Sequence, residues 1–249
     1  MASPPRSRDG RGAAERIGRR VGEVDWEAAA AGLDERGFAR LGRLLTAREC
    51  GALAGLFDDD ARFRSSVEMA RHRFGEGRYR YFAPPLPETV EALRRALYPP
   101  LAAITNRWWR ALGETERFPT RLDAFLRSCR RAGQARPTPL LLRYGPGGFN
   151  CLHQDLYGSV AFPLQATILL SDPERDFQGG EFLLLEQRPR RQSRGTAVAL
   201  ARGEAIVFPN AVRPVSGVRG VLRAQHRHGV SEVRAGVRFA LGVIFHDAR

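Results

Sequence analysis

A change in the pattern of apolar residues near position 139 is the feature that most constrains the fold of this chain. After this position the apolar residues form short runs interrupted by Gly, Pro, Asp and Asn, as in strands joined by turns. The runs lie at residues 140–144, 161–170, 180–185, 203–208 and 237–245. Long helical periods are absent from this part of the sequence. The pattern therefore predicts a C-terminal sandwich or closed sheet built from short strands.

The N-terminal half carries helical signals instead. Asp25 precedes an Ala-rich segment, and Thr46 and Glu49 stand at the spacing of a capping box, in which each side chain bonds a free amide at the helix start. The apolar residues recur at the intervals of helices that pack along one face of a sheet. Further helices are expected at 87–97, 100–112 and 120–131, and short strands at 37–41 and 78–82. We therefore expect an α+β fold with N-terminal helices packed on one face of the C-terminal strands.

Residues 1–22 differ from the rest of the chain in composition. They combine six Arg with Gly, Ala, Ser and Pro, which predicts a flexible basic N-terminal tail. The remaining residues, 23–249, are sufficient for a single domain with one core. Within this domain we expect helical support at 23–135 and the strand core at 138–247.

The charge of the chain is strongly positive and comes from one residue type. The net charge is +13, and all 40 basic residues are Arg, with no Lys. Such an excess attracts polyanions, so nucleic acid is a candidate partner, although a bias toward Arg, Ala and Gly can also reflect coding composition. The Arg-rich loop at 187–194 and the segment 1–20 are the candidate contacts for an acidic substrate.

The sequence carries no sign of export or membrane insertion. No apolar stretch approaches the roughly 20 residues needed to span a bilayer, and the first residues lack the apolar segment of a signal peptide. Cys50, Cys129 and Cys151 are odd in number and lie in unrelated contexts, so they do not suggest a disulfide framework. A cytoplasmic protein without membrane contact is expected.

His153 and Asp155 form the first chemical signal. In an extended segment residues i and i+2 point to the same side, so an imidazole and a carboxylate can meet at one point. A second imidazole from a distant strand, His226 or His228, would complete a set of two His and one carboxylate. That set holds iron(II) and leaves coordination positions open for an oxidant and a co-substrate. Farther along, Arg238 supplies a planar cation that can grip a carboxylate with two bonds.

Other residues near this signal have less specific interpretations. Cys151 could share the face of His153, but a small buried apolar residue is the more common role of such a cysteine. His72 lies among arginines and is expected to face solvent. His246 is adjacent to Asp247 rather than two residues away, so the two cannot face one point along a strand. We expect His246 to make a hydrogen bond that closes the last strand.

A set of motifs in the C-terminal part resembles the iron(II)- and 2-oxoglutarate-dependent dioxygenase superfamily. The motifs are Tyr144-x-x-Gly147, His153-x-Asp155, Gly179-Gly180-Glu181-Phe182, Gly203-Glu204-Ala205-Ile206-Val207-Phe208 and His228-Gly229-Val230-x-x-Val233-x-x-Gly236-x-Arg238. In that superfamily an Arg or Lys follows the distal His at the offset that separates Arg238 from His228. The resemblance implies a double-stranded β-helix (jelly-roll) core, with His228 rather than His226 as the second imidazole ligand.

The resemblance also implies a role for each residue of the site. His153, Asp155 and His228 would hold a catalytic iron(II). Arg238 would bind the far carboxylate of 2-oxoglutarate, which serves as co-substrate, and Tyr144 would contact the co-substrate beside it. Dioxygen would be the oxidant, and the chain would be an oxidoreductase.

Two segments are similar to a bacterial branch of the superfamily described as oxygenases of damaged DNA. They are Arg227-His228-Gly229-Val230-Ser231 and Ile244-Phe245-His246-Asp247-Ala248. The implied function is hydroxylation or oxidative demethylation of a substrate, with damaged nucleic acid as the candidate and DNA repair as the role. Hydroxylation of protein side chains of the prolyl type, oxidation of a small molecule, and non-catalytic binding of nucleic acid stay open as alternatives.

Overall fold

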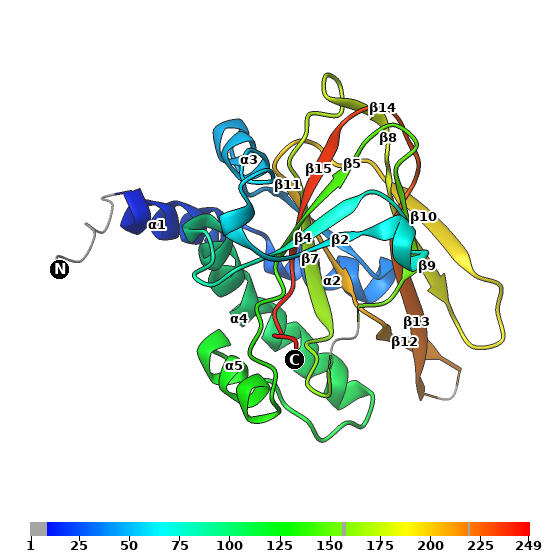
Figure 1. The fold of residues 1–249 in the computed structure, drawn as a ribbon. Helices are drawn as coiled ribbons and strands as arrows, with labels where there is room; N and C mark the ends of the chain where they lie inside the picture. The colour runs from blue at the N-terminus through cyan, green and yellow to red at the C-terminus, as the bar shows by residue number, and fades with distance from the viewer. Residues whose placement is uncertain (1–8, 156–157, 219) are drawn as a thin grey trace.

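Two antiparallel sheets form the centre of the molecule. The computed structural model describes residues 9–155, 158–218 and 220–249 (Figure 1). In the described part of the chain, the larger sheet has the order β1 (Ala39–Arg43), β11 (Glu204–Pro209), β7 (Leu164–Leu169), β15 (Arg238–Val243), β5 (Leu140–Tyr144), β4 (Arg78–Phe82) and β2 (Phe63–Glu68).

The second sheet lies across from the first and contains the strands that were hardest to predict. Its order is β10 (Arg194–Val198), β9 (Phe182–Gln187), β13 (Gly220–Val230), β6 (Phe149–His153) and β3 (Gly75–Glu76), with β12 (Val212–Gly217) paired to β13. A separate pair joins β14 (Val233–Gly236) to β8 (Phe177–Gly179). All of the described strand pairings are antiparallel.

The helices belong mostly to the N-terminal half, as expected. They are α1 (Asp9–Gly22), α2 (Trp26–Arg36), α3 (Ala47–Ala54), α4 (Glu88–Ala111) and α5 (Leu122–Arg131), with 3-10 turns η1 (Asp60–Arg62) and η2 (Met69–His72). Asp25 caps α2, and the predicted capping box of Thr46 and Glu49 is present at the start of α3. None of the helices in the described ranges combines the length and the hydropathy needed to cross a bilayer.

The strands of the larger sheet present different faces to two apolar clusters. Ala166 and Ile168 of β7 pack with the helices in the main core. Tyr144, Leu184 and Phe208 belong to a second cluster between the two sheets. The helices therefore cover one face of the larger sheet, and the other face is directed toward the second sheet (Figure 1).

The expectation of a flexible tail at 1–22 is wrong for residues 9–22, and residues 1–8 lie outside the described range. Residues 9–22 form α1, which packs along α4 (Figure 1). Ala13, Ile17 and Val21 are buried, with Ile17 fully so, and Arg20 bonds the Leu44 carbonyl at 2.7 Å. These three apolar residues recur at i, i+4 and i+8, the stripe of an amphipathic helix. Because the segment is rich in Arg, its composition indicated a flexible tail and the apolar stripe was not recognised.

The expected break between helices at 97 and 100 is absent, because α4 continues through Pro99 and Pro100. A proline in a helix interior leaves a carbonyl without its partner and costs about 3 kcal/mol. Here Leu97, Tyr98 and Leu101 are fully buried, whereas the two prolines lie on the solvent side. Burial of the neighbouring residues thus keeps the helix continuous, and the carbonyls freed by the prolines are on the face that meets water.

Candidate active site

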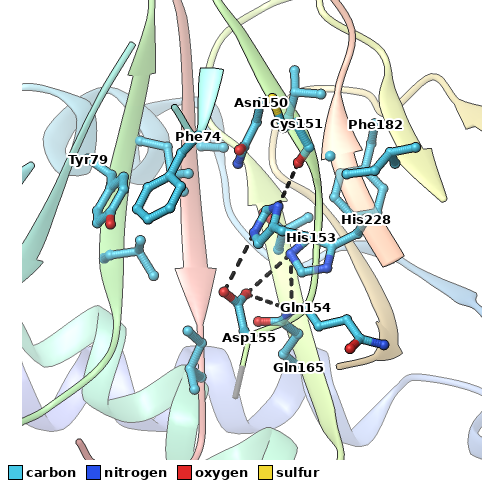
Figure 2. Close-up of a pocket in the computed structure, with 18 of the residues that line it drawn as sticks. Phe74, Tyr79, Asn150, Cys151, His153, Gln154, Asp155, Gln165, Phe182 and His228 are labelled. Atoms are coloured by element: carbon cyan, nitrogen blue, oxygen red, sulfur yellow. Dashed lines mark hydrogen bonds and ion pairs between the residues drawn. The ribbon is translucent and has the colours of Figure 1, made fainter. Parts of the chain in front are cut away.

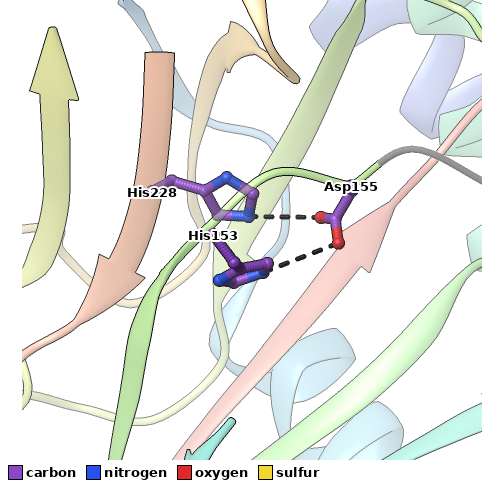
Figure 3. Close-up of side chains that lie close together, drawn as sticks. All are labelled: His153, Asp155 and His228. Atoms are coloured by element: carbon purple, nitrogen blue, oxygen red, sulfur yellow. Dashed lines mark ion pairs between the residues drawn. The ribbon is translucent and has the colours of Figure 1, made fainter. Parts of the chain in front are cut away.

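The two predicted histidine ligands meet across a pair of neighbouring strands. His153 ends β6 and His228 lies directly opposite it on β13. Their ring centroids are 4.2 Å apart, and Asp155 follows β6 so that its carboxylate lies against both rings (Figure 3). One ligand atom from each residue lies within 4.8 Å of the other two. The strand pairing therefore assembles two imidazoles and one carboxylate at one point, as a divalent metal requires.

Electrostatic contacts join the three side chains. Oδ1 of Asp155 is 3.5 Å from Nε2 of His153, and Oδ2 is 3.2 Å from Nε2 of His228. Burial would raise the pKa of Asp155, but the hydrogen bonds and charges of the two imidazoles outweigh it and hold the pKa well below its ordinary value. Burial lowers the pKa of His228, whereas for His153 the carboxylate overcomes burial and raises the pKa. The carboxyl group is therefore an anion, the form that binds a metal.

The His153 ring is oriented by a backbone group. Its Nδ1 lies 2.8 Å from the carbonyl oxygen of Cys151 and donates to it, which leaves Nε2 as the ring nitrogen that faces Asp155. Such a bond to the second ring nitrogen is the usual way in which a ligating imidazole is fixed. The buried Nδ1 of His228 has no hydrogen-bond partner among the described residues.

Gln165 completes the polar group and was not found from the sequence. Its side-chain Nε2 donates to Oδ2 of Asp155 at 3.0 Å and lies 3.2 Å from Nε2 of His228 (Figure 2). Every residue of β7 is buried on both faces of the sheet, so no alternation of polar and apolar residues marked this position. A polar residue in the middle of a buried strand was the one available signal.

These side chains line a cavity of about 390 Å³ between the two sheets. Arg238 reaches the same cavity from β15 and is 2% exposed. Its Nε has no hydrogen-bond partner in the part of the chain that the structure describes, and the charge of Glu181 acts on the guanidinium without forming an ion pair with it. Its nearest ring neighbours are Tyr144 and Phe177, with centroids at 5.6 and 5.9 Å. A buried cation without a carboxylate in direct contact indicates a site for a bound anion.

Tyr144 lies beside Arg238, as the sequence suggested. The two residues are paired across β5 and β15, and Asn150 donates to the Tyr144 hydroxyl at 3.4 Å. Burial raises the pKa of Tyr144 to about 12, so the hydroxyl stays protonated and can donate a hydrogen bond. The side chain lines the cavity.

The glycine pair of the Gly179-Gly180-Glu181 motif has a steric explanation. A Cβ on Gly180 would lie 2.8 Å from Cδ of Arg238 and 2.9 Å from Val233. Gly180 also has a φ of +64°, a conformation that side chains disfavour. The missing side chain therefore leaves room for the stem of Arg238 to enter the cavity.

His226, the alternative second ligand, lies in a different cluster. It is 1% exposed, and its Nε2 is 3.0 Å from Glu186 and 3.2 Å from Nε of Arg213. It is not part of the group that joins His153, Asp155 and His228. The structure therefore brings together the set that contains His228.

The remaining residues singled out in the sequence lie around the site, and not all of them have the expected environment. Cys151 is exposed at the cavity wall, so the expectation of a buried apolar role is wrong. It lies on β6, and its Sγ is 3.9 Å from the carbonyl oxygen of Arg73. His72 is exposed, as expected, and His246 accepts a hydrogen bond from the Phe162 amide at 3.2 Å. In the loop after β9, Arg188 turns back to bond Glu186 at 2.6 Å.

Comparison with known proteins places the chain in a family. The model of the Oxygenase-NA family, described as an oxygenase catalysing oxidative methylation of damaged DNA, matches residues 77–248. This range includes every residue of the site described above. The chain belongs to this oxygenase family.

Relatives and solved structures agree with this placement. Two Mycobacterium tuberculosis proteins of uncharacterised function, from different strains, are each 53% identical over 167 residues, which covers 67% of this oxygenase and 72% of each relative. An oxidoreductase of the 2OG-Fe(II) oxygenase family from Burkholderia pseudomallei has a TM-score of 0.52 at 20% identity, covering 91% of this chain and 96% of that one. A prolyl 4-hydroxylase from Phytophthora capsici has a TM-score of 0.54 at 17% identity, covering 100% of this chain and 68% of that one.

The comparisons confirm the fold and the enzyme class predicted from the sequence. The shared fold is the double-stranded β-helix, and the family is one of oxygenases, so the chain is an oxidoreductase. The His–Asp–His donor set fits the iron(II), 2-oxoglutarate and dioxygen chemistry that the sequence led us to expect.

Proposed function

We propose that this oxygenase uses iron(II) and 2-oxoglutarate to oxidise methyl groups on the bases of damaged nucleic acid. The observation that carries the proposal is the joint presence, in one cavity, of the His153–Asp155–His228 set and the unpaired guanidinium of Arg238. The first fits a divalent iron and the second fits the far carboxylate of a dicarboxylic acid. A single unit of residues 9–249, with helical support and a jelly-roll core, would carry the activity in the cytoplasm.

The residues present fit both absent groups. Two neutral imidazole nitrogens and one carboxylate are the donor set typical of iron(II) in oxygenases and leave open positions for other ligands. When bound, iron(II) supplies the activation of dioxygen that is coupled to decarboxylation of 2-oxoglutarate. Gln165 would hold one oxygen of Asp155 by its hydrogen bond, and Arg238 would hold the co-substrate by a paired, charge-assisted contact.

The protein itself contributes orientation and exclusion of water. Leu142, Phe182, Phe208 and Val230 form apolar parts of the cavity wall. An apolar wall strengthens the attraction between Arg238 and a carboxylate, because fewer water molecules compete for either charge. The protonated Tyr144 hydroxyl beside Arg238 adds a donor for the same carboxylate.

The substrate part of the proposal rests on the description of the family, which names damaged DNA, and on the net charge of +13. Oxidation of an N-methyl group inserts oxygen into a C–H bond, while 2-oxoglutarate becomes succinate and carbon dioxide. The resulting N-hydroxymethyl group loses formaldehyde and leaves N–H. The oxidative step would therefore remove methyl groups from a base.

Product analysis tests the proposal. Protein loaded with one iron(II) under anaerobic conditions is given 2-oxoglutarate, oxygen and methylated oligonucleotides, and succinate and formaldehyde are measured. We expect both products in a 1:1 ratio, and loss of both in His153→Ala, Asp155→Ala and His228→Ala, whose folding is checked by circular dichroism. Succinate release that responds to a peptide or a small molecule, with no formaldehyde from any oligonucleotide, would overturn the substrate assignment.

A further inference from the structure

The mouth of the cavity carries a large apolar side chain that solvent reaches. Phe74 lies between η2 and β3, lines the cavity and is 47% exposed. In Figure 2 its ring points toward the space between Tyr79 and His153. Leu152, on the neighbouring β6, also lines the cavity and is 41% exposed. An enzyme that keeps such groups at the entrance of its site has an apolar surface available for a substrate.

The backbone holds Phe74 firmly in this exposed position. Its carbonyl accepts a hydrogen bond from the Cys151 amide at 2.8 Å, and its own amide donates to the Met69 carbonyl at 3.1 Å. The next residue, Gly75, pairs with β6 so closely that a Cβ would lie 2.3 Å from the carbonyl oxygen of Phe149. The exposure of Phe74 is therefore built into the strand pairing and does not come from a loose loop.

The residue before Phe74 shows a second constraint. Arg73 has a φ of +59°, in the left-handed region that non-glycine residues rarely adopt. This turn brings Arg73 to the cavity mouth next to Phe74. Local strain of this kind persists where the surrounding structure holds it, and it is found preferentially at functional sites.

The edge of the mouth is cationic and aromatic. Arg71 and Arg73 are exposed, and neither forms an ion pair with a carboxylate among the residues that the structure describes. The ring of His72 stacks against Phe74, with centroids 5.4 Å apart and planes 22° from parallel. An aromatic surface flanked by free cations suits a ligand with a flat π-system joined to anionic groups.

We propose that Phe74 is the stacking platform for the substrate base, and that Arg71 and Arg73 contact the phosphates on either side of it. This inference rests on the proposed function, since it identifies how a nucleic-acid substrate reaches the site. The base would be one that is already unstacked, in a single strand or at a lesion, because a paired base cannot lie against Phe74 and face His153 at once. A prolyl ring has no π-face and a peptide has no regular phosphates, so neither would use this combination.

Binding of a short single-stranded oligonucleotide with one N-methylated adenine tests the platform. Stacking of one base on an aromatic side chain typically contributes about 1–3 kcal/mol, so Phe74→Leu should weaken binding by roughly 5- to 150-fold. Phe74→Trp should restore it, which a merely structural role would not predict. Phe149→Leu is the matched control, because Phe149 is 36% exposed on the adjacent strand but does not line the cavity. Its affinity should equal that of the wild type.

The salt dependence of the same binding tests the cations. For single strands the slope of log K against log salt changes by about 0.7 for each phosphate that the protein no longer neutralises. We expect that change for Arg71→Ala and for Arg73→Asn, where Asn is chosen because it tolerates the left-handed conformation. Arg130→Ala, at an exposed position of α5, should leave the slope unchanged.

The outcomes separate this inference from the proposed function. Wild-type protein that releases formaldehyde, together with a Phe74→Leu variant that binds as tightly as wild type, overturns the platform alone. Equal weakening in Phe74→Leu and Phe149→Leu also overturns it, because the effect would then be structural. Wild-type protein that turns over 2-oxoglutarate with another acceptor but releases no formaldehyde overturns both.

Discussion

The cluster of Arg213, Glu186 and His226 is expected to stabilise the fold through a single buried arginine. Arg213 is 0% exposed and Glu186 is 5% exposed, and their closest contact is 2.6 Å. Arg213 also donates to the carbonyls of Asp34 and Glu35 at 2.5 and 3.3 Å. Those carbonyls are in the last turn of α2, where the helix offers them no partner. One side chain therefore joins α2, β9, β12 and β13.

Replacing Arg213 with Met keeps an unbranched apolar stem and removes the charged guanidinium. Burial raises the pKa of Glu186, but His226, Arg188 and Arg213 together hold it far below its ordinary value, so the carboxylate stays charged. Removing Arg213 takes away the fully buried cation that pairs with Glu186, and breaking a buried pair from one side typically costs about 3–5 kcal/mol. That is a large part of the roughly 5–15 kcal/mol by which a domain is stable.

Arg188→Met is the matched control for this change. Arg188 bonds the other oxygen of Glu186 at 2.6 Å, but its side chain is 30% exposed. A partly solvated pair of this kind contributes about 1 kcal/mol or less. The same carboxylate thus has one buried and one accessible partner, and burial alone should decide which substitution is severe.

Urea denaturation at neutral pH measures both effects as free energies of unfolding. The double variant Arg213→Met/Glu186→Leu should be more stable than the sum of the single variants predicts, by about 2 kcal/mol, because no buried carboxylate is left without its buried cation. Equal destabilisation by Arg213→Met and Arg188→Met would refute the reasoning. So would strict additivity in the double variant.

His246, Ile17 and Arg238 each give a further measurable expectation. Burial lowers the pKa of His246 to about 4. In the unfolded chain the imidazole is protonated below about pH 6.5, so the free energy of unfolding should fall by about 3 kcal/mol from pH 6.5 to 4. His246→Gln should show a weaker dependence of this free energy on pH in urea titrations. Ile17→Ala should cost about 2–5 kcal/mol by the same method, because Ile17 is fully buried in α1; an unchanged stability would mean that α1 does not pack. Arg238→Ala should retain iron binding but raise the concentration of 2-oxoglutarate needed for half-maximal turnover at least about 30-fold, the equivalent of roughly 2 kcal/mol. An unchanged concentration would reject the role of Arg238 in binding the co-substrate.

The proposed metal-binding set could be predicted because its strongest constraint is local. Two residues two positions apart on a strand share a face, so His153 and Asp155 needed no tertiary information. The Gly180 and Arg238 positions came from the resemblance to a superfamily, and the structure supplies the steric reason for them. Most strands of the larger sheet were also predicted, since turn residues bound them, but β2 (Phe63–Glu68) was not.

Other parts of the site depend on tertiary contacts that no local pattern reports. Gln165 belongs to a strand buried on both faces, where side-chain polarity does not alternate. Phe74 comes from the N-terminal half and reaches the cavity only because β3 pairs with β6. The helix α1 was missed for a different reason: its apolar stripe is three residues long within a segment rich in Arg, and composition outweighed periodicity.

The choice between His226 and His228 shows where alternation stops being informative. Both residues are buried and lie on the same face of β13, as their spacing predicts. What separates them is their level along the strand, which the register of the neighbouring strands sets. His226 lies opposite Glu186 on β9, and His228 lies opposite His153 on β6. Periodicity predicts the face of a strand, but only pairing decides which of two equivalent histidines meets the carboxylate and which joins a structural ion cluster.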